Sequence, residues 1–374
     1  MPVLLEPVVH SAITIVVFLL MLGVLVVIHE VGHFVTARLA NVRVLEFGIG
    51  FPPRAKVLSS DGETLYTLNW LPIGGFVKLE GEEGESDDPR SFVRASLPTK
   101  LAILVAGVAM NLLLAFAVFT AIAWLPGRVG ALGFERVQPG SPAEEAGLTP
   151  TDRIVSVDGR VYLRDDDPFG DGFLEMLTDL RAKAGQTVTL GVLRVTGEER
   201  TVTVRLRSPD EIGPERGALG IEQLRFSLTD RELTRSPGEA IALGAEWTGE
   251  AFAFVLDGLG QLVRSIATSP TEAPPATGPI GIAVGVGNVF WQAGVVATIH
   301  LAAILSANLA LVNILPFPPL DGGRVVMVIL KRLVGERLSV RAEQLTYLVG
   351  FAFLFAFLIW ITAFDIARLG GGVQ

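Results

Sequence analysis

The segment "VVIHEVGHFV" at residues 26–35 places two histidines and a glutamate at the end of an apolar run. On an α-helix, positions i and i+4 share a face, so the imidazoles of His29 and His33 project in one direction, about 6 Å apart along the axis. Two neutral imidazoles in this arrangement can bind one Zn²⁺, and Glu30 beside them is suited to be the general base that activates water. The alternative is that Glu30 and His33 are only interfacial polar residues at the end of a membrane span.

A zinc site of this kind needs a third protein ligand and an open position for water. Glu46 and Glu63, which follow the two histidines, are conceivable ligands. Asp321 is a stronger candidate, because it is the first carboxylate after 48 uncharged residues and lies in the turn-rich segment "NILPFPPLDGGR". Its alternative role is a helix cap for the residues that follow.

The chain that must position these residues is 374 residues long, half of them hydrophobic and only 18% charged. Four charge-free stretches are long enough to span a bilayer, which needs about 20 apolar residues: Pro7–His29, Leu101–Gly127, Ala273–Leu320 and Gln344–Phe364. We therefore expect a multi-pass α-helical membrane protein with transmembrane helices at residues 1–36, 99–127, 291–316 and 344–365. The lack of cysteine excludes disulfides and thiolate ligands, and the net charge of −9 argues against nucleic-acid partners.

The orientation follows from the basic residues, which favour cytoplasmic loops. Lys and Arg gather between the first and second spans and again between the third and fourth spans, whereas residues 1–10 contain none. Both basic segments should therefore be cytoplasmic, which places the two termini and residues 128–290 outside and the His29–Asp321 site near the cytoplasmic face. No Lys or Arg precedes Arg38, so we expect the first span to be retained and not cleaved as a signal sequence.

"HEVGH" in the first span, followed much later by "NILPFPPLDGG", resembles the site-2 protease family of intramembrane zinc metalloproteases. The chain is most similar to bacterial members with a periplasmic PDZ domain, of the type that regulates sigma factors. The resemblance implies an enzyme that hydrolyses a peptide bond within or beside a membrane segment. It also implies that His29, His33 and Asp321 bind zinc, that Glu30 is the catalytic base and that Asn313 holds substrate near the metal.

Two further stretches match this family. "LPIGGFVKLEGE" at residues 71–82 is similar to an element that usually forms a membrane-associated β-loop, and the β-prone runs before it predict a β-hairpin region over residues 37–98. We expect Gly75, Phe76, Val77 and Lys78 to bind an extended substrate at a strand edge; an ordinary cytoplasmic hairpin is the alternative. "AGVAMNLLLA" resembles a Gly-Pro-x-x-Asn motif in which Val108 replaces the proline, and Asn111 either contacts substrate or forms a helix–helix hydrogen bond.

The segment outside the membrane divides in two. Residues 128–208 alternate as strands do around short helices and resemble an inserted α+β PDZ domain, in which "GALGF" at residues 130–134 looks like a carboxylate-binding loop. A near copy, "GALGI" at residues 217–221, leaves the peptide groove unassigned. Residues 209–290 are expected to form an amphipathic helix and a Gly/Pro-rich linker. The helix would present Glu239, Glu246, Glu250 and Asp257 opposite Ile241, Trp247, Phe254, Leu256 and Leu262. Residues 317–343 should hold the "LDG" loop and a cytoplasmic helix, and residues 366–374 a tail.

These features predict a multi-pass protein of the inner membrane whose partners are the lipid bilayer and single-pass membrane proteins already trimmed by another protease. Such substrates include anti-sigma factors and signal-peptide remnants. An inactive PDZ-bearing scaffold or chaperone is the alternative, although the glutamate of "HEVGH" would serve no purpose there. His10 lies before the first span, on the far side of the bilayer from His33, so it is not expected to be a ligand. His300 lies roughly 20 Å from Asn313 along its span and is interpreted as a helix-packing or cavity histidine.

Overall fold

The structure is a computed structural model. It describes residues 2–82, 84, 86–164, 172–194, 196–213, 216–269, 272–334 and 340–369. The chain forms two compact units: one comprises the residues up to Thr120 together with those from Gly244 onward, and the other is Ala121–Leu243. Residues 335–339, in the expected cytoplasmic segment, and residues 370–374, in the expected tail, lie outside the described part.

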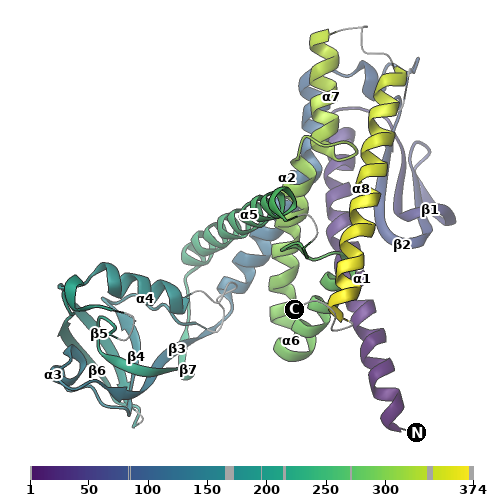
Figure 1. Cartoon of the computed structure of the whole chain (residues 1–374). Helices are drawn as coiled ribbons and strands as arrows, with labels where there is room; N and C mark the ends of the chain where they lie inside the picture. Colours follow the sequence, from purple (N-terminus) through teal and green to yellow (C-terminus); the bar gives the residue numbers. More distant parts are fainter. Residues whose placement is uncertain are drawn as a thin grey trace. The chain divides into compact units, whose positions relative to one another are not determined.

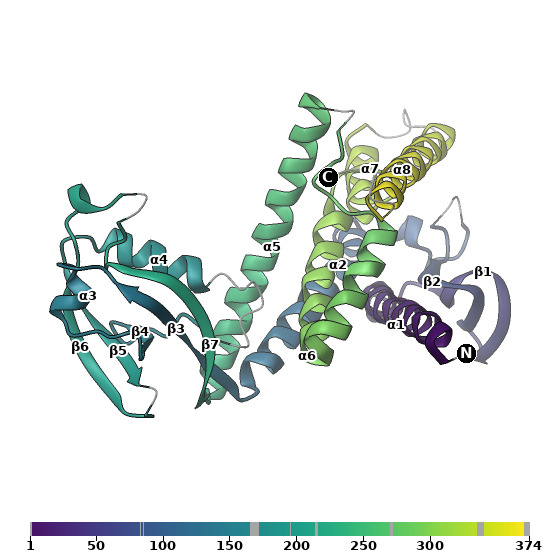
Figure 2. The ribbon, with the colours of Figure 1, turned by 60° about the horizontal axis from the view of Figure 1, so that its bottom comes forward.

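The first unit is built on four long helices, which Figures 1 and 2 show together with the hairpin β1–β2 beside them. They are α1 (Pro2–Leu39), α2 (Leu97–Trp124), α6 (Pro279–Ile314) and α8 (Val340–Leu369). Each is long and apolar enough to cross a bilayer. Large apolar side chains such as Leu20, Leu348 and Ile359 point outward, where lipid would cover them. The predicted membrane protein class is confirmed, and the helices differ from the expected ends by a few residues, as helix termini commonly do.

The helix α6 differs more from expectation, because it begins at Pro279 and not near residue 291. Its N-terminus is capped from a distant segment: the backbone N–H groups of Gly278 and Gly281 donate to the buried carboxylate of Asp365, at 3.1 and 2.8 Å. From the sequence alone this segment is only a Gly-rich stretch, which gave no sign of the helix. The linker predicted up to residue 290 was therefore wrong from residue 279 onward, where α6 begins. Gly294 interrupts α6 with a φ of 83°, a conformation that glycine adopts readily.

A two-stranded antiparallel hairpin packs against the ends of α1 and α2. Its strands are β1 (Val44–Ser60) and β2 (Leu65–Leu79), and the turn is closed by Asp61, whose carboxylate accepts the backbone N–H groups of Glu63 and Thr64. Buried Val44, Leu79 and Ile103 belong to one apolar cluster that joins the hairpin to both helices. The cluster also includes Phe92 from the 3₁₀ helix η1 (Phe92–Arg94), and α7 (Asp321–Val334) packs against it.

The second unit is an antiparallel sheet of five strands in the order β6-β5-β4-β3-β7. The strands are β3 (Gly127–Val137), β4 (Asp152–Val157), β5 (Thr187–Arg194), β6 (Glu199–Arg205) and β7 (Ile221–Leu233). The short helices α3 (Pro142–Glu145) and η2 (Pro209–Glu211) and the longer α4 (Gly172–Ala182) complete the unit. Buried Leu132, Met176 and Leu190 lie in its core, which therefore joins β3, α4 and β5.

Two expectations about this unit were wrong. The unit does not end at residue 208, because β7 returns to pair with β3 along the whole strand. "GALGF" is not a loop: its Leu132 lies in β3, opposite Ile154 of β4 on one side and Phe226 of β7 on the other. The local sequence could not reveal this, because the strand that flanks the motif lies about ninety residues later in the chain.

The helix α5 (Pro237–Thr268) is continuous, but its packed face is not the predicted one. Trp247, Ala251 and Val255 are buried, whereas Ile241, Phe254 and Leu256, which were expected on the same apolar face as Trp247, are more than half exposed. A side chain at Gly244 would clash with Thr120 of α2, so the helices approach closely at this glycine. The buried face of α5 therefore contains Trp247 and small residues such as Ala251, whereas the large residues Ile241 and Leu256 lie outside it.

Candidate metal centre

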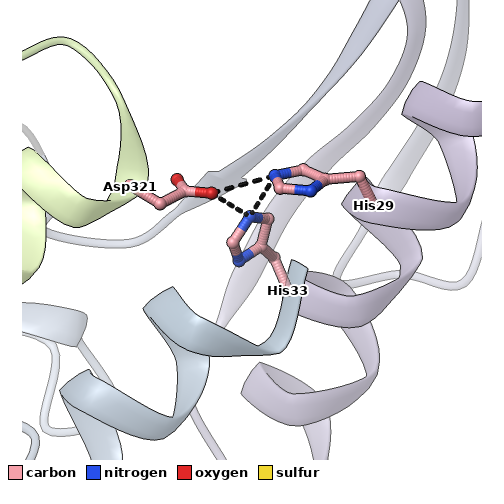
Figure 3. A group of neighbouring side chains, drawn as sticks. All are labelled: His29, His33 and Asp321. Atoms are coloured by element: carbon pink, nitrogen blue, oxygen red, sulfur yellow. Dashed lines mark hydrogen bonds and ion pairs between the residues drawn. The ribbon is translucent and has the colours of Figure 1, made fainter. Parts of the chain in front are cut away.

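The side chains of His29 and His33, in the C-terminal half of α1, point toward that of Asp321, as Figure 3 shows. His29 and His33 are buried, and Asp321 is the first residue of α7. His29 Nε2 lies 2.9 Å from Asp321 Oδ2, His33 Nε2 lies 3.3 Å from the same oxygen, and the two nitrogens are 3.1 Å apart. Residues 292 positions apart along the chain therefore present three donor atoms to one point.

This donor set fits zinc. Ligand atoms about 2.0–2.2 Å from a tetrahedral Zn²⁺ lie roughly 3.3–3.6 Å from one another. The three observed separations, 2.9 to 3.3 Å, are slightly shorter, so a small outward movement of the side chains would admit the ion. Two imidazoles and one carboxylate leave a fourth position open, which is the arrangement of catalytic zinc sites.

A backbone carbonyl fixes the orientation of one imidazole. His33 Nδ1 lies 2.8 Å from the Ile103 carbonyl oxygen. Because a carbonyl only accepts hydrogen bonds, the proton of the neutral ring must be on Nδ1, which leaves the lone pair of Nε2 directed at the other two donors. Residues of α2 therefore support the site that α1 and α7 form.

Charged groups around Asp321 keep its carboxylate ionised. Burial alone would raise the pKa of Asp321, but when an imidazole carries a proton on Nε2 its hydrogen bond to the carboxylate outweighs burial and holds that pKa well below the usual range. Arg324, one turn later on α7, forms an ion pair with Glu82, and the nearby Glu82 and Asp321 carboxylates raise its pKa against the opposing effect of burial. This ion pair connects α7 to the end of the hairpin segment.

The donors open into a cavity of about 490 Å³. Glu30, His33 and Asp321 lie on its wall, together with Phe76, Val77 and Lys78 of β2. Gly75 lies directly against Glu30: a Cβ there would be 3.3 Å from Glu30 Cγ. A carboxylate, metal donors and a strand thus border one open cavity, which suits the hydrolysis of an extended polypeptide.

Other predicted residues lie elsewhere. Asn313 is half-buried in the last turn of α6 and is not on the cavity wall, and Asn111 is completely buried beside His29. Glu46 forms an ion pair with Arg54, so it does not serve as the third ligand. His10 stacks on Trp291 and His300 packs against Trp247.

Glu63, the other glutamate that the sequence left open, is also engaged away from the metal donors, because it forms ion pairs with Arg38 and Arg90. Sequence reasoning missed Ile103, Gly107 and the Arg324–Glu82 pair. Every residue has a backbone carbonyl, so the identity of residue 103 cannot show that its carbonyl accepts a hydrogen bond from a histidine. Arg324 and Glu82 are far apart in the chain, so no sequence spacing predicts their ion pair.

Comparison with known proteins agrees with this chemistry. Residues 17–357 match the model of a family described as Peptidase family M50. A protein of Agrobacterium fabrum named as a putative zinc metalloprotease is 30% identical over 377 residues, 96% of each chain. One of Clostridium acetobutylicum with the same description is 30% identical, over 95% of this chain and 98% of its own. The zinc metalloprotease RasP of Geobacillus kaustophilus is 26% identical, over 95% of this chain and 98% of its own.

Proposed function

Because the chain belongs to peptidase family M50, the site-2 protease family of zinc metalloproteases, we propose that it cleaves the transmembrane segments of other membrane proteins. One observation carries the proposal. The donor atoms of His29, His33 and Asp321 lie within 4.8 Å of one another, beside a cavity that Glu30 and the end of β2 also line. Three of the five elements around this cavity, α1, α2 and α7, are spanning helices or follow directly from one, which supports access to the site by a membrane segment.

Each residue of the site has a role that its position supports. His29, His33 and Asp321 would hold the zinc, which when bound polarises a peptide carbonyl and makes water a better nucleophile. The Glu30 carboxylate takes a proton from water as the water oxygen attacks the carbonyl carbon. It then passes that proton to the amide nitrogen as the carbon–nitrogen bond breaks, so one residue acts first as base and then as acid.

The hairpin supports the binding of an unwound substrate. A transmembrane helix resists hydrolysis because its backbone amides are bonded internally, so a segment must be extended before it is cut. In the described part of the chain, β1 and β2 pair only with each other, which leaves an edge on β2. Phe76, Val77 and Lys78 line the cavity from β2, and strand pairing there would align an extended peptide beside the metal donors.

The remaining proposals concern orientation and substrate choice. Lys100, Arg324 and Lys331 gather at the same end of the helices as the site, which favours a cytoplasmic position for it in the inner membrane. We assign the five-stranded unit as an extracytoplasmic PDZ domain, which with α5 would admit only substrates already trimmed by another protease. Anti-sigma factors and signal-peptide remnants are substrates of this kind.

The proposal is tested with full-length protein purified in detergent, wild type and Glu30→Gln. Zinc is quantified, a single-pass model substrate is added, and the cut is located by mass spectrometry. We expect equal zinc in both proteins, a cut inside the apolar segment by wild type, and no cut by the variant. Cleavage only outside the apolar segment would refute intramembrane proteolysis, and equal cleavage by the variant would remove Glu30 from the reaction.

The trimming requirement is tested separately, with two versions of that substrate. One carries a folded extracytoplasmic domain and the other ends a few residues beyond the membrane. We expect wild type to cut only the short version, and a variant that lacks the residues of the five-stranded unit to cut both. If the intact enzyme cuts both versions at one rate, the screening role is wrong while the protease assignment stands.

A further inference from the structure

We propose that one face of α2 orients the two imidazoles for zinc, and that Asn111 is the positioning residue for His29. The face consists of Ile103, Gly107 and Asn111, which are four residues apart and therefore lie one above another along the helix. The inference rests on the proposed function, because it takes both imidazoles as zinc ligands. Each of the three positions meets the histidines in a different way.

Ile103 and Gly107 hold the imidazoles by contact with the backbone. The Ile103 carbonyl accepts from His33 Nδ1, as described above. At Gly107, a Cβ would lie 2.7 Å from both Cε1 and Nε2 of His29 and closer still to His33 Nε2. Any side chain there would enter the space of the ligand atoms. Gly107 has no positive φ, so the requirement for glycine comes from the imidazoles and not from backbone conformation.

Asn111 reaches the far side of His29. Its side chain is completely buried, its Nδ2 lies 3.4 Å from His29 Nδ1, and its Oδ1 has no hydrogen-bond partner. A half-turn of the amide exchanges oxygen and nitrogen. His29 Nδ1–H then donates to Oδ1, which satisfies the buried oxygen and leaves the lone pair of Nε2 for the metal. In the opposite orientation the amide would donate to Nδ1, the proton would be on Nε2, and His29 could not bind zinc.

The hydrogen bond between α2 and α6 at this position does not use the Asn111 side chain. Ser306 of α6 donates from Oγ to the Asn111 backbone carbonyl, at 2.7 Å. Side chain and backbone of one residue thus have separate partners, the imidazole and the neighbouring helix. This separation allows the two roles to be tested independently.

The test compares zinc affinity in four full-length proteins: wild type, Asn111→Leu, Asn111→Asp and Ser306→Ala. Affinity is measured by competition with a chromogenic chelator, and ligand geometry by the visible absorption of the Co²⁺-substituted proteins. Loss of such a supporting hydrogen bond typically weakens metal binding about 10–100-fold. We expect that loss and an altered cobalt spectrum for Asn111→Leu, near-wild-type values for Asn111→Asp, which keeps the acceptor, and no change for Ser306→Ala, the matched control for helix packing.

Two results would overturn the inference: wild-type zinc affinity for Asn111→Leu, or an equal loss for Ser306→Ala. Thermal unfolding in the presence of chelator shows whether each metal-free protein is folded. If Asn111→Leu is not, Gly107→Ala takes its place, and wild-type affinity in that variant would equally overturn the inference. A wild-type protein that binds no zinc would instead refute the proposed function, so the two failures are distinguishable.

Discussion

Substitution of Gly75 by alanine should slow catalysis without removing the metal. A Cβ at this position would lie 3.3 Å from Glu30 Cγ and 3.0 Å from the Gly48 carbonyl oxygen. Ordinary carbon–oxygen contacts are about 3.3–3.6 Å, so β2 must move by roughly 0.3–0.6 Å relative to β1, and this displaces the strand beside Glu30. Catalytic groups must be held within about 0.5 Å, and a 1 Å error can cost about 100-fold in rate. We therefore expect cleavage by Gly75→Ala to fall about 3–10-fold, and by Gly75→Val about 100-fold.

The assay measures kcat and KM on the single-pass model substrate, with zinc content determined on the same samples. Gly23→Ala is the matched control, because a Cβ at that position of α1 would have no atom within 4 Å. We expect equal zinc in all these proteins and unchanged kinetics for the control. Wild-type kinetics for Gly75→Val would refute the contact between β2 and the base, and loss of zinc in Gly75→Ala would show that the strand supports the metal donors instead.

Contacts at Asp321, Asp365 and Lys183 can be tested in the same way. Asp321→Asn removes the charged donor, so its zinc affinity should fall at least 100-fold. Thermal unfolding with and without chelator should then show that zinc raises the melting temperature of wild type but not of this variant. Asp365→Ala leaves two backbone N–H groups of α6 without their acceptor, so the free energy of unfolding in detergent should fall by about 1–3 kcal/mol. Lys183 donates to Asp158 and Asp179 and lowers the pKa of both carboxyl groups, although burial opposes this at Asp179. Carboxyl groups with a lowered folded pKa stabilise the fold above their ordinary pKa near 3.8 and lose that effect as the pH falls through the folded pKa. The melting temperature of Lys183→Met should therefore be lower than that of wild type at pH 7, and the two should become equal in acid.

The helices and the metal donors could be predicted from the sequence because both depend on local periodicity. His29 and His33 share a helix face by their spacing alone, and the hydropathy of the spans limited where their ends could lie. Asp321 required one more step, the argument that the first and third spans reach the same membrane face. The structure brings it within 2.9 Å of His29.

The features that were missed depend on partners distant in sequence. The start of α6 is set by Asp365, 87 residues after Gly278. The packed face of α5 is set by the close approach to Thr120 at Gly244, where only a small residue fits. A hydrophobicity pattern instead predicts large apolar residues at a packed position. In the same way, the glycine at 107 has no local explanation, since its neighbours are the two imidazoles of another helix.

The placement of the donors also implies that zinc and tertiary structure stabilise each other. Polar groups at the ends of membrane spans are costly unless they are paired, and here they come from separate elements, with His29 and His33 on α1, Asp321 on α7 and Asn111 on α2. A metal ion that binds this assembled set, and not the separated helices, adds its binding free energy to the packing of the helices. Zinc removal should therefore loosen the contact of α7 with α1 before any spanning helix unfolds. Hydrogen exchange should then rise first in residues 321–334, and uniform exchange across all helices would contradict this coupling.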